Sequence, residues 1–173
     1  MLMPQPEPWL RGTHTDLPAI LRAVVHALEL ARENVDEACA LLPDEALHAR
    51  PGGVAPIAFH LRHIARSLDR LLTYAEGGQL SEAQLAALKT EMEPGTAKSE
   101  LLAEFHAGLD QALGRIHAFA GAGLDSEFEQ ARGVGRKALP TTVGGLLVHC
   151  ADHTQRHAGQ LVTTARIVAS HSI

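Results

Sequence analysis

Aromatic residues, cysteines and long apolar runs are all scarce in this chain of 173 residues, and each scarcity excludes a class of protein. Aromatic side chains make up only 3% of the residues, although apolar residues together make up 46%. Alanine and leucine must therefore fill much of the interior, which favours helices over sheets. A chain of this length can bury a substantial core, and we expect a single domain over residues 1–173.

The small number of cysteines and the net charge indicate the cellular compartment and exclude some classes of binding partner. Cys39 and Cys150 fall on segments that we expect to be different helices, which is typical of a reduced, cytoplasmic protein. No apolar run is long enough to span a membrane, and the first twelve residues hold no apolar segment typical of a signal peptide. The formal net charge is −5 and there is no basic stripe, so we expect neither a nucleic-acid nor a membrane partner.

Four long segments show apolar residues at alternating steps of three and four, which is the spacing of one buried helix face. We expect helices over about residues 16–42, 56–76, 97–120 and 141–170. Thr15 or Asp16 is expected to cap the first helix, with Pro18 in its first turn, and Ser81 is expected to cap a short accessory helix. Four helices, each with one apolar face of this kind (its apolar seam), predict an all-α fold, specifically an antiparallel four-helix bundle.

Two segments lack this periodicity. Residues 1–12 are expected to form an extended N-terminal lead, pinned to the rest of the chain by Trp9. Residues 121–140 are expected to form a loop without regular structure, and loops of that length inside a compact domain are often functional. The fragment GVGRK within this loop superficially suggests a phosphate-binding loop, but no expected strand precedes it.

Histidine, by contrast, is unusually common, with eleven in the chain. The stretch HCADHTQRHAGQ places His149, His153 and His157 at intervals of four, and Gln160 follows shortly after. Positions four apart on an α-helix differ by only about 40° around the axis, so all four residues share one narrow strip. Two imidazoles at this spacing can bind the same metal ion. The alternative is that they form an ordinary hydrogen-bonded or solvated helix face.

A second stretch, HLRHIARS, supplies the histidines that could face this strip from another helix. His63 borders the apolar stripe of its helix, whereas His60 is expected to point further toward solvent. Helical bundles build metal sites from inward-facing side chains on different helices, so we predict that His63, His153 and His157 bind one divalent ion. Three imidazoles leave a position open for water or substrate, and nitrogen ligands suit zinc, nickel, cobalt or copper better than magnesium.

Four further residues on the last expected helix lie close to these histidines, and more than one role is possible for them. His149 is either a supporting acid or base or a half-buried helix histidine. Gln160 either orients a ligand or a water, or lies at the rim. Cys150 is expected to be a buried structural cysteine rather than a reactive thiol. Gly159, inside a helix where glycine is unfavourable, suggests a close approach of backbone or substrate.

These residues resemble the DinB-like (DinB/YfiT) superfamily over nearly the whole chain. The resemblance covers the lead PWLRG, the stretch GGVAPIAFHLRHIARS and the run LLVHCADHTQRHAGQL. The family's hallmark is one histidine in the second helix and an H-x-x-x-H pair followed by x-Gly-Gln in the last helix. His63, His153 and His157 match these positions, with Gly159 and Gln160 after the pair.

The resemblance implies a four-helix bundle with a divalent ion, zinc or nickel, held by His63, His153 and His157, and commonly a homodimer. Known relatives include metal-dependent transferases that use low-molecular-weight thiols such as bacillithiol or mycothiol. It therefore implies an enzyme that transfers such a thiol to a small electrophilic molecule. The alternatives are a metal-dependent hydrolase and a non-catalytic metal-binding stress-response protein. Arg156 and Ala158 depart from the residues that are frequent in the family, which leaves the substrate open.

Overall fold

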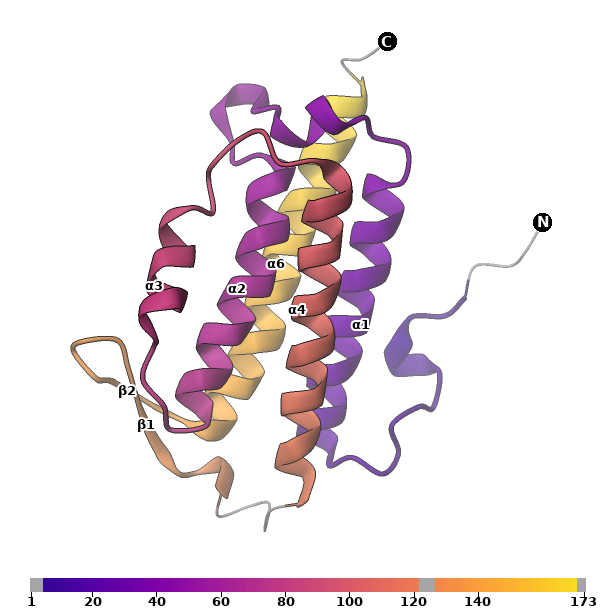
Figure 1. Ribbon diagram of the computed structural model, residues 1–173. Coiled ribbons are helices and arrows are strands. Elements are labelled where there is room, and N and C mark those ends of the chain that lie inside the picture. Colours follow the sequence, from indigo (N-terminus) through magenta and orange to yellow (C-terminus); the bar gives the residue numbers. More distant parts are fainter. Residues whose placement is uncertain (1–4, 122–126, 171–173) are drawn as a thin grey trace.

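The computed structural model describes residues 5–121 and 127–170, and most of them are helical. Four long helices lie side by side (Figure 1): α1 (Ala19–Cys39), α2 (Ile57–Ala75), α4 (Lys98–Ala118) and α6 (Val143–Ser170). Helix α1 packs against α4 and α6, and α2 packs against the same two helices. The predicted all-α class is therefore confirmed. No helix among the described residues combines the length and apolarity needed to cross a membrane.

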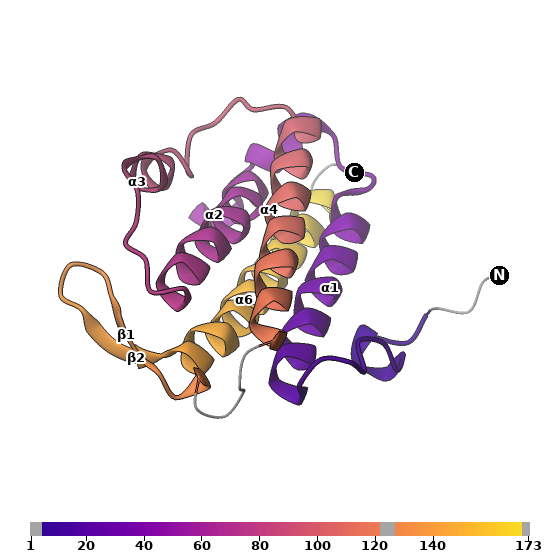
Figure 2. The ribbon, with the colours of Figure 1, turned by 60° about the horizontal axis from the view of Figure 1, so that its bottom comes forward.

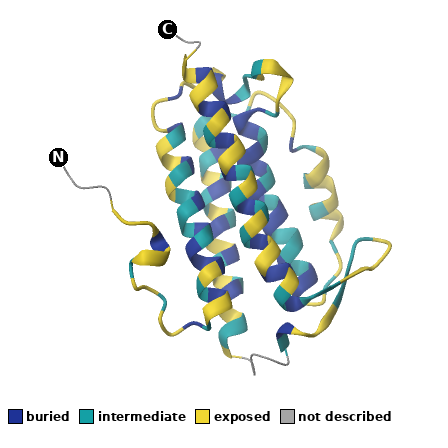
Figure 3. Ribbon diagram, turned by 180° about the vertical axis from the view of Figure 1, so that it is seen from behind, coloured by how far each residue is buried: buried dark blue, intermediate teal, exposed yellow. Residues whose placement is uncertain are grey.

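The apolar seams of the long helices meet in one core (Figure 3). The largest side chains with no exposed surface come from all four helices and include Leu28, Leu61, Phe105, Leu109 and Leu161. The predicted segments are correct to within about three residues at each end. Helix α1 begins later than expected because Pro18 has ψ 149° and precedes the helix, so Thr15 and Asp16 lie outside it and do not cap it.

The short helix α3 (Glu82–Lys89) runs beside α2 and brings the chain back toward the start of α4 (Figure 1). Ser81 caps it, as predicted: its Oγ accepts a hydrogen bond from the backbone N of Gln84 at 3.2 Å. In turn, the side-chain oxygen Oε1 of Gln84 accepts a hydrogen bond from the backbone N of Ser81 at 2.9 Å, which completes a capping box. The residues just after this helix contribute to the site described below.

The expectation of an irregular loop over residues 121–140 is wrong for its second half. Strands β1 (Ala131–Val134) and β2 (Leu139–Thr142) form an antiparallel hairpin that stands out beside the start of α6 (Figure 2). Four-residue strands are too short to show a clear period of two, and so the hairpin escaped the sequence pattern. GVGRK occupies the end of β1 and the turn, where Gly135 has a φ of 70°. Residues 122–126 lie outside the described residues.

The N-terminal lead differs from the expectation in two ways. It contains a short 3₁₀ helix, Pro8–Leu10, instead of being extended throughout. Trp9 does not pin it, since 61% of that residue is exposed. Instead, Arg11 donates two hydrogen bonds to the carboxylate of Glu33 on α1, at 2.6 and 2.8 Å. A bidentate pair of this kind fixes both distance and orientation, so it holds the lead alongside α1.

Candidate metal centre

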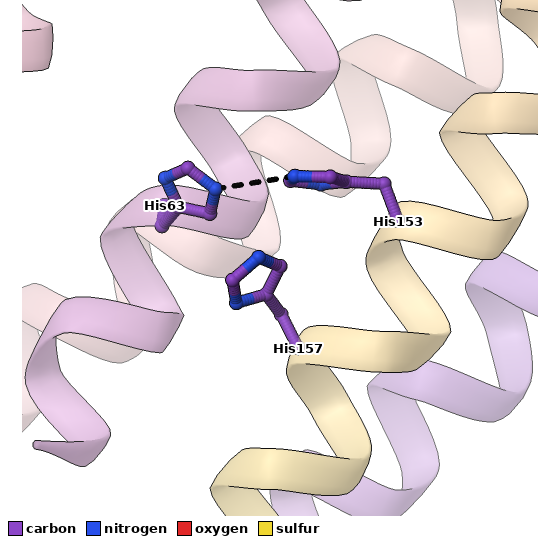
Figure 4. Close-up of side chains that lie close together, drawn as sticks. All are labelled: His63, His153 and His157. Atoms are coloured by element: carbon purple, nitrogen blue, oxygen red, sulfur yellow. Dashed lines mark hydrogen bonds between the residues drawn. The ribbon is translucent and has the colours of Figure 1, made fainter. Parts of the chain in front are cut away.

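The structure brings the three predicted histidines together between α2 and α6 (Figure 4). His63 projects from α2, and His153 and His157 project from successive turns of α6, with all three rings pointing toward one another. The Nε2 atoms of His63 and His153 are 3.3 Å apart, and the ring of His157 is centred 4.4 Å from that of His63. One ligand nitrogen from each ring lies within 4.8 Å of the other two.

These distances fit a metal ion. Zinc–nitrogen bonds are about 2.0–2.1 Å long, so two nitrogens on a tetrahedral ion are about 3.4 Å apart. The observed 3.3 Å between the Nε2 atoms of His63 and His153 is close to that value. The donor set is entirely imidazole nitrogen, which suits zinc and nickel. The three residues can therefore hold a divalent ion, although that they do so stays a prediction.

A buried carboxylate orients His63. Glu91, which is only 4% exposed, lies just beyond α3 and its Oε2 accepts a hydrogen bond from His63 Nδ1 at 2.6 Å. Its other oxygen, Oε1, accepts one from Arg70 at 2.8 Å. Because Nδ1 carries the proton in this arrangement, the lone pair of His63 lies on Nε2, on the side of the other two rings.

The other two rings are oriented in the same way. His153 Nδ1 lies 3.3 Å from Ser67 Oγ, and this hydroxyl donates its own hydrogen to the carbonyl of Ile64 at 3.1 Å. His157 Nδ1 lies 3.0 Å from Nδ1 of His60. In each case a partner outside the triad occupies Nδ1, which leaves Nε2 for a metal. Partners of this kind set the tautomer and the ring direction of metal-binding histidines.

The expectation that His60 points toward solvent is wrong. His60 is only 3% exposed and lies against His157 and Phe59, whose rings are centred 5.3 and 5.2 Å away. The sequence pattern counts apolar residues as buried, but a histidine can be buried equally well when its ring nitrogen has a hydrogen-bond partner. Here the partner comes from α6, and this contact cannot be read from α2 alone.

An aromatic ring covers one side of the triad. Phe59 stacks on His63, with ring centroids 5.0 Å apart and planes 19° from parallel, and it meets His157 edge-on at 6.1 Å. Phe59, Ser67 and Glu91 were not predicted to be part of the site. Phe59 precedes HLRH directly and Ser67 closes HLRHIARS, so proximity to the histidines was a usable signal for both. Glu91 follows a different, short helix and carries no such signal.

Burial keeps the free histidines neutral. Burial and, to a lesser extent, repulsion between neighbouring charged rings together lower the pKa of His60, His153 and His157 to about 4 each. A metal ion binds the neutral form of an imidazole, so protons compete with it weakly near pH 7. The site is thus prepared for a cation other than a proton.

Acidification is expected to destabilise the metal-free protein. An unfolded imidazole takes up a proton near pH 6.5, whereas folded His60 has a pKa of about 4. The unfolded state therefore binds more protons in the range between, so the free energy of unfolding falls as the pH is lowered through that range. We expect His60 alone to account for roughly 2 kcal/mol between about pH 7 and about pH 5. Urea unfolding with a metal chelator at both pH values measures this loss.

The control for this measurement is a pair of histidine variants. His60→Gln removes one of three buried titrating imidazoles and should reduce the dependence of stability on pH by the contribution of His60, while His153 and His157 keep theirs. His149→Gln changes a histidine whose side chain is 44% exposed, and it should leave the wild-type dependence in place. A wild-type free energy of unfolding that stays constant between the two pH values would contradict the assignment of buried neutral imidazoles.

Glu91→Gln is expected to weaken metal binding by about 10–100-fold, which is typical when the group that orients a metal-binding histidine is altered. Burial by itself would raise the pKa of Glu91, but the hydrogen bonds from His63 and Arg70 outweigh it and lower that pKa. Glu91 is therefore charged, and the substitution deprives His63 of a charged partner. Glu93→Gln serves as the control, because Glu93 is exposed, lies two residues away, and loses the same charge in this substitution. Competition with a chromophoric zinc chelator measures both affinities. Equal affinities for the two variants would contradict a role for Glu91.

The remaining sequence predictions have mixed outcomes. Cys150 is fully buried, as expected, and burial raises the pKa of its thiol to about 12, so it is not a reactive thiolate. His149 lies at the edge of the triad, its ring centred 5.4 Å from that of His153. Gln160 is exposed and forms no hydrogen bond with the triad in the described part of the chain. A Cβ on Gly159 would meet nothing within 4 Å, so the expected close approach of backbone is wrong.

Two cavities flank the triad. One, of about 530 Å³, is lined by His60, Arg156, Gly159 and Gln160 among others, and it touches the triad through the contact of His60 with His157. The other, of about 270 Å³, is lined by Phe59 and Glu91 among others. The larger one falls within the range of small-molecule sites. Gly159 lines this larger cavity, which accounts for the open space beside it.

Comparison with known proteins identifies the family of this chain. The family model of the DinB superfamily matches residues 27–161, which include all three histidines of the triad and Glu91. No curated protein shows a significant match to the chain. The family match covers more than three quarters of the chain, so the chain belongs to the DinB superfamily.

Proposed function

We propose that this protein is a divalent-metal-dependent enzyme that transfers a low-molecular-weight thiol to a small electrophilic molecule. The observation that carries the proposal is the convergence of His63, His153 and His157, each with its Nδ1 engaged elsewhere. Three protein ligands are the pattern of catalytic zinc sites, because structural sites are normally closed by four. Zinc or nickel is the expected ion, since all three donors are imidazole nitrogens.

A divalent ion at this site would act as a Lewis acid and lower the pKa of a thiol or a water. The chain itself supplies the remaining functions. The stacked ring of Phe59 excludes water from one side of the triad. His149, partly exposed at the edge of the site, is placed to accept the proton that the thiol loses and to release it to solvent. In the transfer, a carbon–sulfur bond forms, the bond to the leaving group breaks, and the leaving group departs with the electron pair.

The cavity beside His60 is the proposed binding site for the small molecule. Its lining combines apolar residues, such as Val54 and Ile167, with polar groups such as Arg156 and Gln160. This mixture is usual for sites that bury a small ligand and orient it with a few polar contacts. Arg156 Nη2 donates a hydrogen bond to Asp152 Oδ2 at 2.6 Å, between positions four apart on α6.

A thiol panel tests the proposal. The zinc- or nickel-loaded protein is assayed with bacillithiol, mycothiol and cysteine as donors and with a chloronitroarene as acceptor, and thioether and chloride formation are both followed. We expect product with at least one thiol, and its loss after chelation or in His153→Ala. Loss in His149→Gln with retained metal would support proton acceptance by His149. Metal-loaded protein that is inactive with every thiol would overturn the transferase.

Two alternatives use the same residues. In a hydrolase, water would replace the thiol, and ester or amide substrates would be cleaved with no thiol present. In a non-catalytic metal-binding protein, zinc would bind and neither assay would give product. The cavity next to His60 favours the enzymes over the second alternative, because a storage site needs no space for a substrate.

The family also supports a proposal for the assembly and the topology. We infer that the four long helices form an antiparallel bundle and that two copies of the chain form a homodimer. Nucleic acid and membrane are not expected partners, since the net charge is −5, and the proposed location is the cytoplasm. Light scattering over a range of concentrations tests the dimer, and a monomer at every concentration would remove it.

A further inference from the structure

A second group of metal-binding side chains lies where the N-terminal lead meets α1. His14 comes from the lead, and His26 and Glu29 come from α1. Residues three apart share one helix face, so His26 and Glu29 point to the same side. One ligand atom from each of the three residues lies within 4.8 Å of the other two. The triad described above lies between α2 and α6 and includes no residue of α1, so the two groups are separate.

The contacts within this group divide it into one buried ligand and two accessible ones. His14 Nε2 lies 2.8 Å from Glu29 Oε1, and their side chains are 26% and 30% exposed. His26 is only 6% exposed, its Nε2 lies 3.1 Å from Thr13 Oγ1, and its ring is centred 5.6 Å from that of His14. Two imidazoles and one carboxylate therefore meet beside solvent, with the deeper imidazole anchored in α1.

The backbone at His14 adds a second, independent observation. Its φ is 55°, in the left-handed region that a residue with a Cβ rarely occupies because of steric strain. The side-chain hydrogen bond to Glu29 offsets this strain only weakly, because both side chains are partly exposed to solvent. Strained residues of this kind concentrate at ligand sites, where another interaction offsets the strain. His117, on α4, adds another imidazole whose ring is centred 5.8 Å from that of His14.

The geometry points to a second divalent transition-metal site, formed by His14, His26 and Glu29, that fastens the lead to α1. Two imidazoles and one carboxylate are a common donor set for zinc. An ion with bonds of about 2.0–2.1 Å needs its ligand atoms about 3.4 Å apart, so the His14–Glu29 contact of 2.8 Å must open slightly. Both side chains are partly exposed to solvent, which permits this adjustment. Arg11 already ties the lead to Glu33, one turn further along α1, and the ion would add a second tie.

A zinc titration of a chain without the triad tests this site independently of the proposed function. The double variant His63→Ala/His153→Ala removes the first site, and we expect it still to bind one equivalent of zinc. Adding His14→Gln or Glu29→Gln should abolish that binding. His106→Gln is the matched control, because His106 pairs with Asp36 at 2.7 Å yet belongs to no three-residue group in the described part of the chain. No zinc bound by the double variant would overturn the proposal, as would equal binding by all four chains.

Trypsin cleavage after Arg11 gives a second measurement that reports on the lead itself. With free zinc at about 100 times its Kd, local opening of the lead should fall about a hundredfold, and cleavage should slow accordingly. The same zinc should leave the His14→Gln chain unprotected. If the double variant does not fold, the wild-type chain still decides: its zinc content should fall from two equivalents to one in Glu29→Gln. Retention of two equivalents in Glu29→Gln would overturn the site.

Discussion

Replacing His63, His153 or His157 by alanine will weaken zinc binding at the triad by roughly a hundredfold to a thousandfold. Structural zinc sites with four ligands bind with about 10–16 kcal/mol, so one ligand contributes about 2.5–4 kcal/mol. The three rings converge from two helices with their Nε2 atoms toward one centre, so each loss removes a ligand that no described neighbour replaces. The effect should be similar for the residue on α2 and for the two on α6.

The measurement uses the Glu29→Gln chain as the background, so that zinc at the second proposed site does not obscure the result. Competition with a chromophoric chelator then reports the triad alone. His149→Ala should keep the affinity of the background, because that ring lies at the edge of the triad. His60→Ala should lose about tenfold, since His60 orients His157 through its Nδ1 but is not itself a ligand. Equal affinities in all five variants would show that the triad does not bind zinc.

Gly108→Ala will destabilise the folded protein by about 3 kcal/mol, the upper part of the range for an added methyl group in a packed interior. Gly108 on α4 faces Ala65 on α2. A Cβ at Gly108 would lie 2.5 Å from the Cβ of Ala65 and 2.8 Å from its Cα. The second of these contacts involves backbone, so no side-chain rotation relieves it and the two helices must move apart. Urea unfolding of the metal-free chain gives the change in free energy of unfolding.

Gly114 provides the matched control, because it lies on the same helix, is exposed, and a Cβ added to it would meet nothing within 4 Å. Gly114→Ala should stabilise the protein by about 0.8–1.0 kcal/mol through helix propensity alone. The two substitutions are chemically identical and differ only in what the new methyl group meets. If Gly108→Ala stabilised the protein as Gly114→Ala does, the close approach of α2 and α4 would be incorrect.

The elements that could be predicted from the sequence alone are those whose pattern lies in neighbouring residues. The four long helices were predicted from apolar residues that recur every three or four positions. A helix buries one face, and the residues on that face recur at this spacing along the sequence. The pairing of His153 with His157 followed for the same reason, since positions four apart on a helix are neighbours wherever the helix lies. His63 lies beside this pair, as its position at the border of the apolar stripe of its own helix indicates.

Contacts between residues that are far apart in the sequence could not be predicted, and they became visible only in the folded structure. Glu91 reaches His63 from a segment beyond α3, and His60 is buried because His157 on another helix supplies its hydrogen bond. His14 meets Glu29 only once the lead has folded back along α1. Such contacts depend on how packed elements are placed in space, and packing is set by the whole core rather than by the residues on either side.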